Sequence, residues 1–354
     1  MNPRDRLLAA CRREPVDCTP VWFMRQAGRY LPQYKEIRKD RSVIEVCKTP
    51  SICSEVTLLP VKELGVDAAV MFADIMLPLE GMGVSFSIEE NLGPIISDPI
   101  RSLENVERLK DFDPTRDVPY LIEAIKQTKF KLEKDKIGLI GFSGAPFTIA
   151  SYLIEGRPSR DYAETRKLMY NDSESWNLLL SKLSDTISEY LLAQIEAGVD
   201  CVQLFDSWIG VLSAKDYAGN VAPYTKRIFD AIKKERPEVP TIHFGTGNMH
   251  LLSAMKEKAG GDVFSLDWRV PISEACRILG NGVAIQGNLD PAVLLSDQTT
   301  RGKDFIASRV QQVLDEAKES SGHIFNLGHG VLRETPVENA KFVVNYVHSN
   351  TSKE

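Results

Sequence analysis

The sequence of 354 residues lacks most of the features that mark metal-binding, disulfide-bonded or membrane proteins. Its six cysteines are scattered, with no Cys-x-x-Cys or Cys-x-Cys pair, which argues against a zinc site or a disulfide framework and favours a reducing compartment. No apolar run approaches the ~20 residues that a membrane span needs, and the N-terminal segment has no signal-peptide core. We therefore expect a cytoplasmic protein without a metal or a membrane partner.

Motifs for phosphate binding and nucleophilic catalysis are missing as well. Neither Gly-x-Gly-x-x-Gly nor Gly-x-x-x-x-Gly-Lys-Ser/Thr occurs, and Gly81-Met-Gly83 and Gly245-Thr-Gly247 have no third glycine. His-Glu-x-x-His and Gly-x-Ser-x-Gly are also absent. A net charge of -6 and a pI of about 5.6 do not match a general nucleic-acid binder. The sequence predicts no nucleotide cofactor, no covalent serine and no nucleic-acid partner.

A local excess of positive charge stands out against this acidic background. Residues 22–41 contain six basic and two acidic side chains. Arg25 and Arg29 lie on either side of Gln-Ala-Gly, just after an apolar run, and the planar fork of arginine matches carboxylate or phosphate groups. A solvated pair or a surface salt bridge is the alternative, and such bridges contribute only ~0–1 kcal/mol. We interpret the segment as a clamp for an anionic small molecule.

Short β-branched and aromatic runs recur along the chain, separated by stretches with helical periodicity at 176–197, 215–234 and 303–318. Near-continuous apolar runs are typical of strands buried on both faces of a parallel sheet. The predicted strands are residues 21–26, 68–74, 137–143, 201–206, 241–245, 263–267, 283–287 and 323–327. Eight such units predict an α/β fold, a single-domain (β/α)8 TIM-type barrel over residues 1–354, with a doubly wound sheet as the alternative.

Two segments do not fit the repeating unit. Residues 81–117 include an alternating stretch at 83–88 and a turn at 91–94, which we interpret as an insertion or hairpin after the second strand. The polar residues at about 349–354 are expected to fray, because nothing in their composition would tie them down.

A barrel would carry its site at the carboxyl ends of the strands. Asp74 closes the second strand, where its carboxylate either projects into the barrel mouth or caps the next turn, and the residue alone favours neither. His329 lies between glycines that let backbone approach a ligand, and Tyr152 follows the third strand, although single residues of both types are more often structural. His243, inside an apolar strand, is expected in the core. The other strand-end candidates are Ser143, Asp206, Ser207, Thr246, Asn248, Asp267, Asn288, Asp290 and Asn326.

Several motifs of the chain resemble those of uroporphyrinogen decarboxylases. The run Pro20-Val-Trp-Phe-Met-Arg-Gln-Ala-Gly-Arg-Tyr-Leu-Pro32 is similar to the family's N-terminal signature, and Gly141-Phe-Ser-Gly-Ala-Pro-Phe-Thr148 is similar to its second signature. Shorter matches follow at 72–75, 203–207, 286–290 and 326–330, so the resemblance spans essentially the whole chain. It implies a barrel enzyme, usually a homodimer, that converts uroporphyrinogen to coproporphyrinogen in haem biosynthesis by removing carbon dioxide from four acetate side chains, without a cofactor.

The resemblance also implies roles at the matching positions. Asp74 would accept hydrogen bonds from pyrrole N–H groups and balance positive charge on the reacting ring, while Arg25 and Arg29 would hold carboxylates; these three are the implied catalytic residues. The implied substrate-binding residues are Arg25, Gln26, Ala27, Gly28, Arg29, Asp74, Tyr152, Ser207 and His329. Val43 or Ile44 stands where many relatives carry phenylalanine, which concerns an apolar wall contact and not the chemistry.

Elementary chemistry agrees with an aspartate at the centre of such a site. Loss of carbon dioxide leaves an electron pair that needs a sink, which most decarboxylases take from a cofactor. A pyrrole protonated on the ring carbon beside the acetate is its own sink, and a fixed anion would stabilise that cation. Two alternatives remain, a methyltransferase of the same barrel group and a tetrapyrrole-binding protein without activity. The first would need zinc held by closely spaced His and Cys, which the sequence lacks, and the second would not need Asp74.

Overall fold

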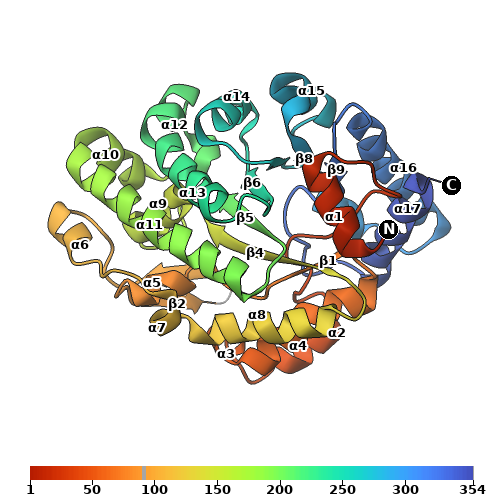
Figure 1. The fold of residues 1–354 in the computed structure, drawn as a ribbon, viewed down its shortest axis with the longest axis horizontal. Helices are drawn as coiled ribbons and strands as arrows, with labels where there is room; N and C mark the ends of the chain where they lie inside the picture. Colours follow the sequence, from red (N-terminus) through yellow and green to blue (C-terminus); the bar gives the residue numbers. More distant parts are fainter. Residues whose placement is uncertain (90–92, 354) are drawn as a thin grey trace.

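Seven parallel strands form a curled sheet at the centre of the molecule, and helices lie around it (Figure 1). The computed structural model describes residues 1–89 and 93–353. The strands follow the order β1, β4, β5, β6, β7, β8, β9, so each strand of the sheet pairs with the one before it in the chain. Their bounds are β1 (Ala68–Val70), β4 (Gly138–Gly144), β5 (Cys201–Asp206), β6 (Thr241–Gly245), β7 (Val263–Ser265), β8 (Ala284–Gln286) and β9 (His323–Ile324).

Helices precede the sheet and connect its strands. The longer ones are α1 (Pro3–Arg12), α4 (Pro50–Leu64), α8 (Pro119–Leu132), α9 (Pro146–Glu155), α11 (Ser173–Ala197), α13 (Ala222–Glu235), α16 (Thr300–Ala317) and α17 (Val337–Thr351). The shorter ones are α2 (Pro32–Arg38), α3 (Val43–Lys48), α5 (Leu77–Gly81), α6 (Leu103–Glu107), α7 (Pro114–Asp117), α10 (Ala163–Asn171), α12 (Ala214–Asn220), α14 (Leu252–Ala254) and α15 (Ile272–Leu279). Tighter or wider turns form η1 (Ile209–Val211), η2 (Met249–Leu251), η3 (Met255–Ala259), η4 (Gly280–Gly282) and η5 (Pro291–Leu295). Within the part of the chain that the structure describes, no helix has the length and apolar character of a membrane span.

The sequence predicted the middle of the sheet better than its edges. β5 and β6 have the predicted bounds, whereas β1, β7, β8 and β9 occupy only part of theirs. The helices predicted at 176–197 and 303–318 are present as α11 and α16. The helix predicted at 215–234 is wrong as a single element, because the chain breaks at Val221 between α12 and α13. Pro223, which has no backbone N–H, lies in the first turn of α13, where a proline is tolerated.

The strand predicted at 21–26 is also wrong, although its first residue completes the pairing of the sheet. The chain turns at Met24 and Arg25, and only Val21 pairs, in a parallel bridge with Phe325 just after β9. On the other side, the Asp67 N–H donates to the Val21 carbonyl over 2.9 Å, directly before β1. Val21 therefore links the two edge strands of the sheet.

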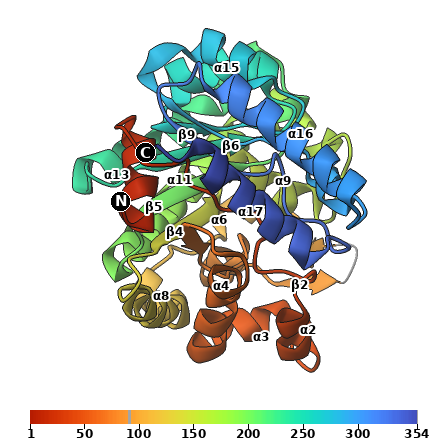
Figure 2. The same cartoon turned by 90° about the vertical axis from the view of Figure 1, so that its right-hand side faces the viewer.

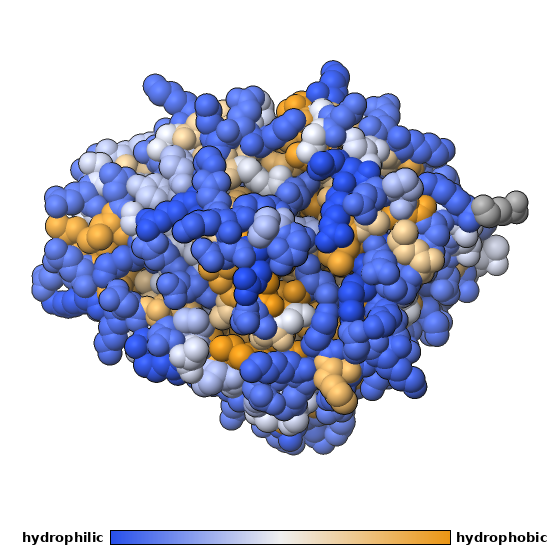
Figure 3. Space-filling view, viewed as in Figure 1, coloured by the Kyte–Doolittle hydropathy of each residue, from blue (hydrophilic) through white to orange (hydrophobic). Residues whose placement is uncertain are grey.

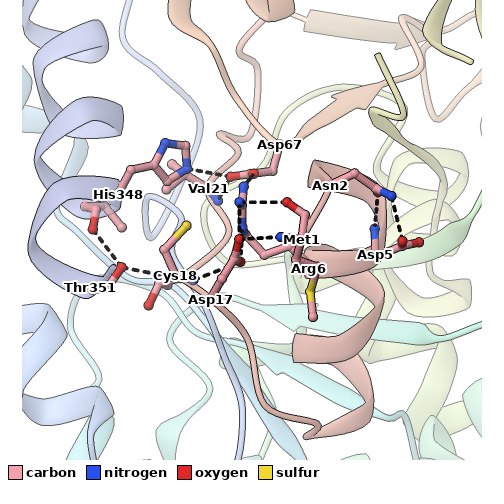
Figure 4. Close-up of polar contacts among 12 residues, drawn as sticks. Met1, Asn2, Asp5, Arg6, Asp17, Cys18, Val21, Asp67, His348 and Thr351 are labelled. Carbon is pink, nitrogen blue, oxygen red and sulfur yellow. Dashed lines mark hydrogen bonds and ion pairs between the residues drawn. The ribbon is translucent and has the colours of Figure 1, made fainter. Parts of the chain in front are cut away.

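The carboxylate of Asp67 holds this junction together (Figure 4). Asp67 is only 1% exposed and accepts hydrogen bonds from the Val21 N–H over 2.7 Å and from His348 Nε2 over 2.8 Å. Arg6 of α1 donates to its other oxygen, and Arg6 Nε also donates to Asp17 over 2.7 Å. One buried carboxylate thus ties α1, the start of β1 and α17 to the residue that joins the sheet edges.

Side chains from the sheet alternate between two apolar layers. Inside the curled sheet, Ile140 and Ile242 pack with Leu7 of α1, which lies near the amino ends of the strands. Outside it, Leu204 and Phe264 pack in the layer shared with the helices. The last two helices, α16 and α17, run next to each other, and α17 also packs on α4 (Figure 2). The face drawn in Figure 3 is mostly hydrophilic, with hydrophobic residues showing in small separate patches.

Between β1 and β4 the chain forms a small antiparallel hairpin of β2 (Phe86–Glu89) and β3 (Gly93–Ile96), in which Phe86 lies opposite Ile96. The turn predicted at 91–94 falls partly outside the described residues, which resume at Gly93. Near the other end of the chain, residues 349–351 of the expected frayed segment form the last turn of α17, and the Lys353 N–H donates to the Asp17 carbonyl over 2.8 Å. Residue 354 lies outside the described residues.

We expect Asp67→Asn to lower the free energy of unfolding by about 3–5 kcal/mol, since it removes one partner of a buried ion pair. Denaturant unfolding followed by circular dichroism measures this change. The control is Asp230→Asn, which removes a solvent-exposed ion pair with Lys226 and should cost less than about 1 kcal/mol. Equal effects of the two substitutions would contradict the role given to Asp67.

Candidate active site

A cavity of about 330 Å³ lies at the carboxyl ends of the strands. Its walls contain aromatic side chains from near the carboxyl ends of β4, β5 and β6, namely Phe142, Phe205 and Phe244. Of the residues predicted for the site, the cavity brings together Arg25, Gln26, Ala27, Asp74, Tyr152, Ser207 and His329. Gly28 and Arg29 do not line it. The predicted set is therefore gathered in one place, except for the second half of the arginine segment.

Arg25 is held at the cavity by an unusual backbone conformation. Its φ of 59° lies in the left-handed region, which a non-glycine residue adopts only when its surroundings impose it. Gln26 supplies that constraint: its Oε1 accepts from the Phe23 N–H over 2.9 Å, and its Nε2 donates to the Ala68 carbonyl of β1 over 2.9 Å. The Gln26 side-chain amide is thus used within the protein, and its backbone N–H likewise donates to the Phe23 carbonyl over 3.1 Å.

Two glycines adjoin this turn. A side chain on Gly330 would collide with the aliphatic part of Arg25, so glycine leaves the space that the arginine fills. A Cβ on Gly28 would lie 2.8 Å from the Arg25 carbonyl oxygen, closer than side chains approach. Arg29, one residue further on, is solvent-exposed, and its charge acts on the phenol of Tyr34. Arg29 therefore lies beside the cavity and not in its wall.

The structure gives Asp74 both of the roles that the sequence left open. Its Oδ1 accepts a hydrogen bond from the Met76 N–H over 2.9 Å, which caps the turn before α5, and the same side chain lines the cavity. Within the described residues this is the carboxylate's one hydrogen bond, so the second oxygen is available to a ligand. Burial raises the pKa of Asp74, and the Met76 N–H and the Arg25 charge oppose that rise.

Tyr152 and Trp208 form an aromatic wall next to Asp74. Tyr152 lies on α9, and burial, with a smaller effect from the Asp74 charge, raises its pKa to about 12, so it remains a phenol at neutral pH. Its ring meets the Trp208 ring edge-on, with centroids 6.0 Å apart. Trp208 was not predicted, although an aromatic residue directly after Ser207 at a strand end was a usable signal.

Thr148 of the second signature lies below this wall. Its hydroxyl accepts from the Trp208 N–H over 3.4 Å and donates to Asp206 Oδ1 over 3.2 Å. Thr148 and Asp206 are fully buried, and together they fix the backbone that carries Ser207. His243 is likewise fully buried, with its Nδ1 3.1 Å from the Gly260 carbonyl, as expected of a core residue.

His329 closes the opposite side of the cavity. Burial lowers its pKa to about 4, and the charges of Arg25 and Arg269 add to this effect while Asp267 opposes it. His329 is therefore neutral at pH 7 and offers one N–H and one acceptor nitrogen. Its ring lies edge-on to Trp268, with centroids 6.2 Å apart.

The remaining sequence candidates do not line the cavity. Val43 and Ile44 begin α3 and do not line the cavity. Among the described residues, no three His, Cys, Asp or Glu side chains are grouped as they would be to hold a metal ion. The arrangement suits a ligand with a flat apolar body, N–H donors for Asp74 and carboxylates for Arg25.

Comparisons with known proteins agree on one family. The family described as "Uroporphyrinogen decarboxylase (URO-D)" matches residues 2–350. A uroporphyrinogen decarboxylase from Carboxydothermus hydrogenoformans is 48% identical over 98% of this chain and 97% of its own, and one from Thermus thermophilus is 49% identical over 97% of both. Among solved structures, a methyltransferase from Methanosarcina mazei aligns with a TM-score of 0.80 over 99% of both chains. At 19% identity, that likeness concerns the fold alone.

We expect Arg25→Gln to raise the pKa of His329 from about 4, because a neighbouring positive charge disfavours protonation of the imidazole. Histidine side-chain NMR over pH 3–8 measures this, with His329→Gln used to assign the signal. Arg301→Gln on α16 is the control and should leave the titration unchanged. A His329 midpoint near 6.5 in the unaltered protein would rule out the environment described here.

Proposed function

The chain belongs to the uroporphyrinogen decarboxylase family, and on that premise we propose that its cavity removes the four acetate carboxyl groups of uroporphyrinogen III as carbon dioxide to give coproporphyrinogen III. The protein is then a carboxy-lyase of porphyrin biosynthesis. The observation that carries the proposal is the meeting of Asp74 and Arg25 in one aromatic-walled cavity. Asp74 supplies an anion beside the pyrrole ring that becomes positively charged in the reaction. Arg25 supplies a cation for the negatively charged carboxylate side chains of the substrate.

The reaction follows from the chemistry of the pyrrole ring. Protonation of the ring carbon beside an acetate gives a cationic ring, and this ring accepts the electron pair that the departing carbon dioxide leaves behind. The exocyclic carbon then gains a proton and becomes a methyl group, while the ring proton is released. Each turnover thus exchanges one carbon dioxide for one proton. Because the ring is the electron sink, we propose no cofactor.

Asp74 is placed to stabilise the cationic ring. Its free oxygen accepts pyrrole N–H groups, while the Met76 N–H fixes the other oxygen over 2.9 Å. A charge already fixed in position does not need to reorganise as the cation forms, which is the main advantage of electrostatic preorganisation. The apolar walls strengthen the interaction because they keep the local dielectric low.

The other predicted residues hold the substrate. We propose that Arg25 and Arg29, with the backbone of residues 26–28, bind carboxylates, Arg29 doing so at the rim since it lies outside the wall. The arginines act by charge and position, because a guanidinium holds its protons too tightly to be a good acid. Tyr152, Ser207 and neutral His329 add hydrogen-bonding groups that carry no charge of their own.

We further propose how the fold completes itself around the site. Residues 20–22 stand in for the first strand of a (β/α)8 barrel, the β2–β3 hairpin is an insertion after its second strand, and residues 1–354 form one domain. Val21, hydrogen-bonded toward β1 and bridged to Phe325, supports this description. The family resemblance also supports a cytoplasmic homodimer, which sedimentation analysis and cell fractionation would test.

Anaerobic, metal-free release of carbon dioxide from uroporphyrinogen III by the purified protein is the direct test of the activity. Stoichiometric carbon dioxide with coproporphyrinogen III as the product supports the proposal. Tight binding of uroporphyrinogen without release of carbon dioxide would show a binding protein instead and would overturn it.

We expect Asp74→Asn to lower kcat by about 10²–10³, the loss seen when one preorganised electrostatic group is removed, while substrate affinity changes little. Asp290→Asn is the matched control. Asp290 is also partly buried and accepts from the backbone N–H two residues on over 2.9 Å, yet it does not line the cavity. Near-normal turnover by the Asp74 variant would refute the role of the anion.

A further inference from the structure

An exposed tryptophan and an arginine lie side by side at the rim of the cavity, just after β7. Trp268 is 39% exposed, which is unusual for so large an apolar side chain, and the Arg269 guanidinium lies over its ring at 4.6 Å from the centroid. The Trp268 ring touches His329, which lines the cavity. The Arg269 charge also acts on His329, as does that of Arg25. Arg25, His329 and Arg269 are therefore neighbours along one side of the opening.

Arg269 is held in place before any ligand arrives. Its Nε and one terminal nitrogen donate to the two oxygens of buried Asp267 over 3.0 and 2.9 Å. That leaves the other terminal nitrogen, with both its N–H groups, on a side chain that is 53% exposed. Because the stacking and the bidentate pair have already fixed the side chain, little conformational entropy is lost when a ligand binds.

The backbone that carries the pair is fixed as well. Asn288 Nδ2 donates to the carbonyls of Asp267 and Val270 over 2.7 and 2.6 Å, one on each side of the pair. Gly328 packs so closely on the Trp268 backbone that any side chain there would collide with it. The rim segment 267–270 is therefore a rigid support that presents the Trp268 ring and the Arg269 guanidinium to solvent.

The size of the cavity explains why a rim site is needed. Its volume of about 330 Å³ is at the small end of the ~300–1,000 Å³ range for pockets that enclose a drug-sized ligand. A macrocycle of four linked pyrroles with acetate and propionate side chains is larger than such a ligand. When its pyrrole N–H groups face Asp74, carboxylates at the edge of the macrocycle reach the opening of the cavity and its rim.

We propose that Arg269, stacked on Trp268, binds a carboxylate at the edge of the macrocycle that lies over the rim, and so positions the macrocycle over Asp74. The proposal rests on the proposed function for its substrate class. The terminal nitrogen of Arg269 that is not bonded to Asp267 donates to the carboxylate. The Trp268 ring packs against the apolar body of the pyrrole ring that carries this carboxylate. Asp267 neutralises part of the positive charge, so the subsite aligns the substrate more than it attracts it.

Anaerobic steady-state kinetics with uroporphyrinogen III tests this subsite. We expect Arg269→Gln to raise KM roughly tenfold, the effect of losing a charge-assisted hydrogen bond, with kcat within about twofold. Arg269→Lys keeps the charge and loses the fork, so its KM should lie in between, and Trp268→Leu should also raise KM. The matched control is Arg277→Gln on α15, which removes another exposed arginine, one that pairs with Glu274 over 2.7 Å. Thermal unfolding of each variant checks that the fold is kept.

A binding measurement separates this inference from the proposed function. For each variant, the affinities for the substrate and for the product, coproporphyrinogen III, are measured anaerobically by titration calorimetry. If Arg269 holds a propionate, the variant loses affinity for substrate and product alike; if it holds an acetate, only substrate affinity falls, because the product carries methyl groups there. Unchanged KM and unchanged affinity in Arg269→Gln, beside an active unaltered protein, would overturn the subsite. Absence of carbon dioxide release by the unaltered protein would overturn the proposed function. The effect of Arg269→Gln on binding affinity would then decide whether the subsite exists.

Discussion

The hydrogen bonds that converge on the Asp67 carboxylate determine whether the sheet can close on itself. A parallel sheet with open edges leaves unpaired backbone groups, and here the two edges are the short strands β1 and β9. Val21 pairs toward both, and Asp67 accepts hydrogen bonds from the Val21 N–H, from Arg6, which balances its charge, and from His348. The Asp67 carboxylate thus holds Val21, through side-chain contacts, in the position where it pairs toward both edges of the sheet.

The contact between the two edges of the sheet also sets the relative positions of the side chains in the site. Arg25 lies a few residues beyond Val21, and Asp74 lies a few residues beyond β1, so bringing the edges together also brings the cation to the anion. The Gln26 amide fixes the distance between them, because it hydrogen-bonds the arginine turn to Ala68 in β1. Gly330 then leaves room for the Arg25 side chain, which places a contribution from the last part of the chain directly in the site. The placement of these two side chains therefore depends on the contacts between the two edges of the sheet and not on any one loop.

The sequence predicts an element or a site residue well when the pattern that marks it lies within a short stretch of the chain. β5 and β6 were predictable to the residue because their apolar runs end at polar or glycine positions. Residues 21–24 have the same composition, yet they pair only at Val21, and composition alone does not show where a chain turns away from its neighbours. Cavity residues were foreseen where a motif named them, as for Asp74 and His329. Trp208 and the Trp268–Arg269 pair were missed because their significance comes from ring contacts between segments distant in sequence.

Hydrogen bonds between the two ends of the chain also determine when the site forms during folding. The Met24 N–H donates to Asn326 Oδ1, across 302 positions, and the Val331 N–H donates to the Met24 carbonyl. Contacts so distant in sequence form late, because the intervening loop must be ordered first. On the ribosome, the arginine turn is made early and waits until almost the whole chain has emerged. A product truncated before residue 326 therefore lacks the hydrogen bonds that hold the turn of Arg25 in place beside the cavity.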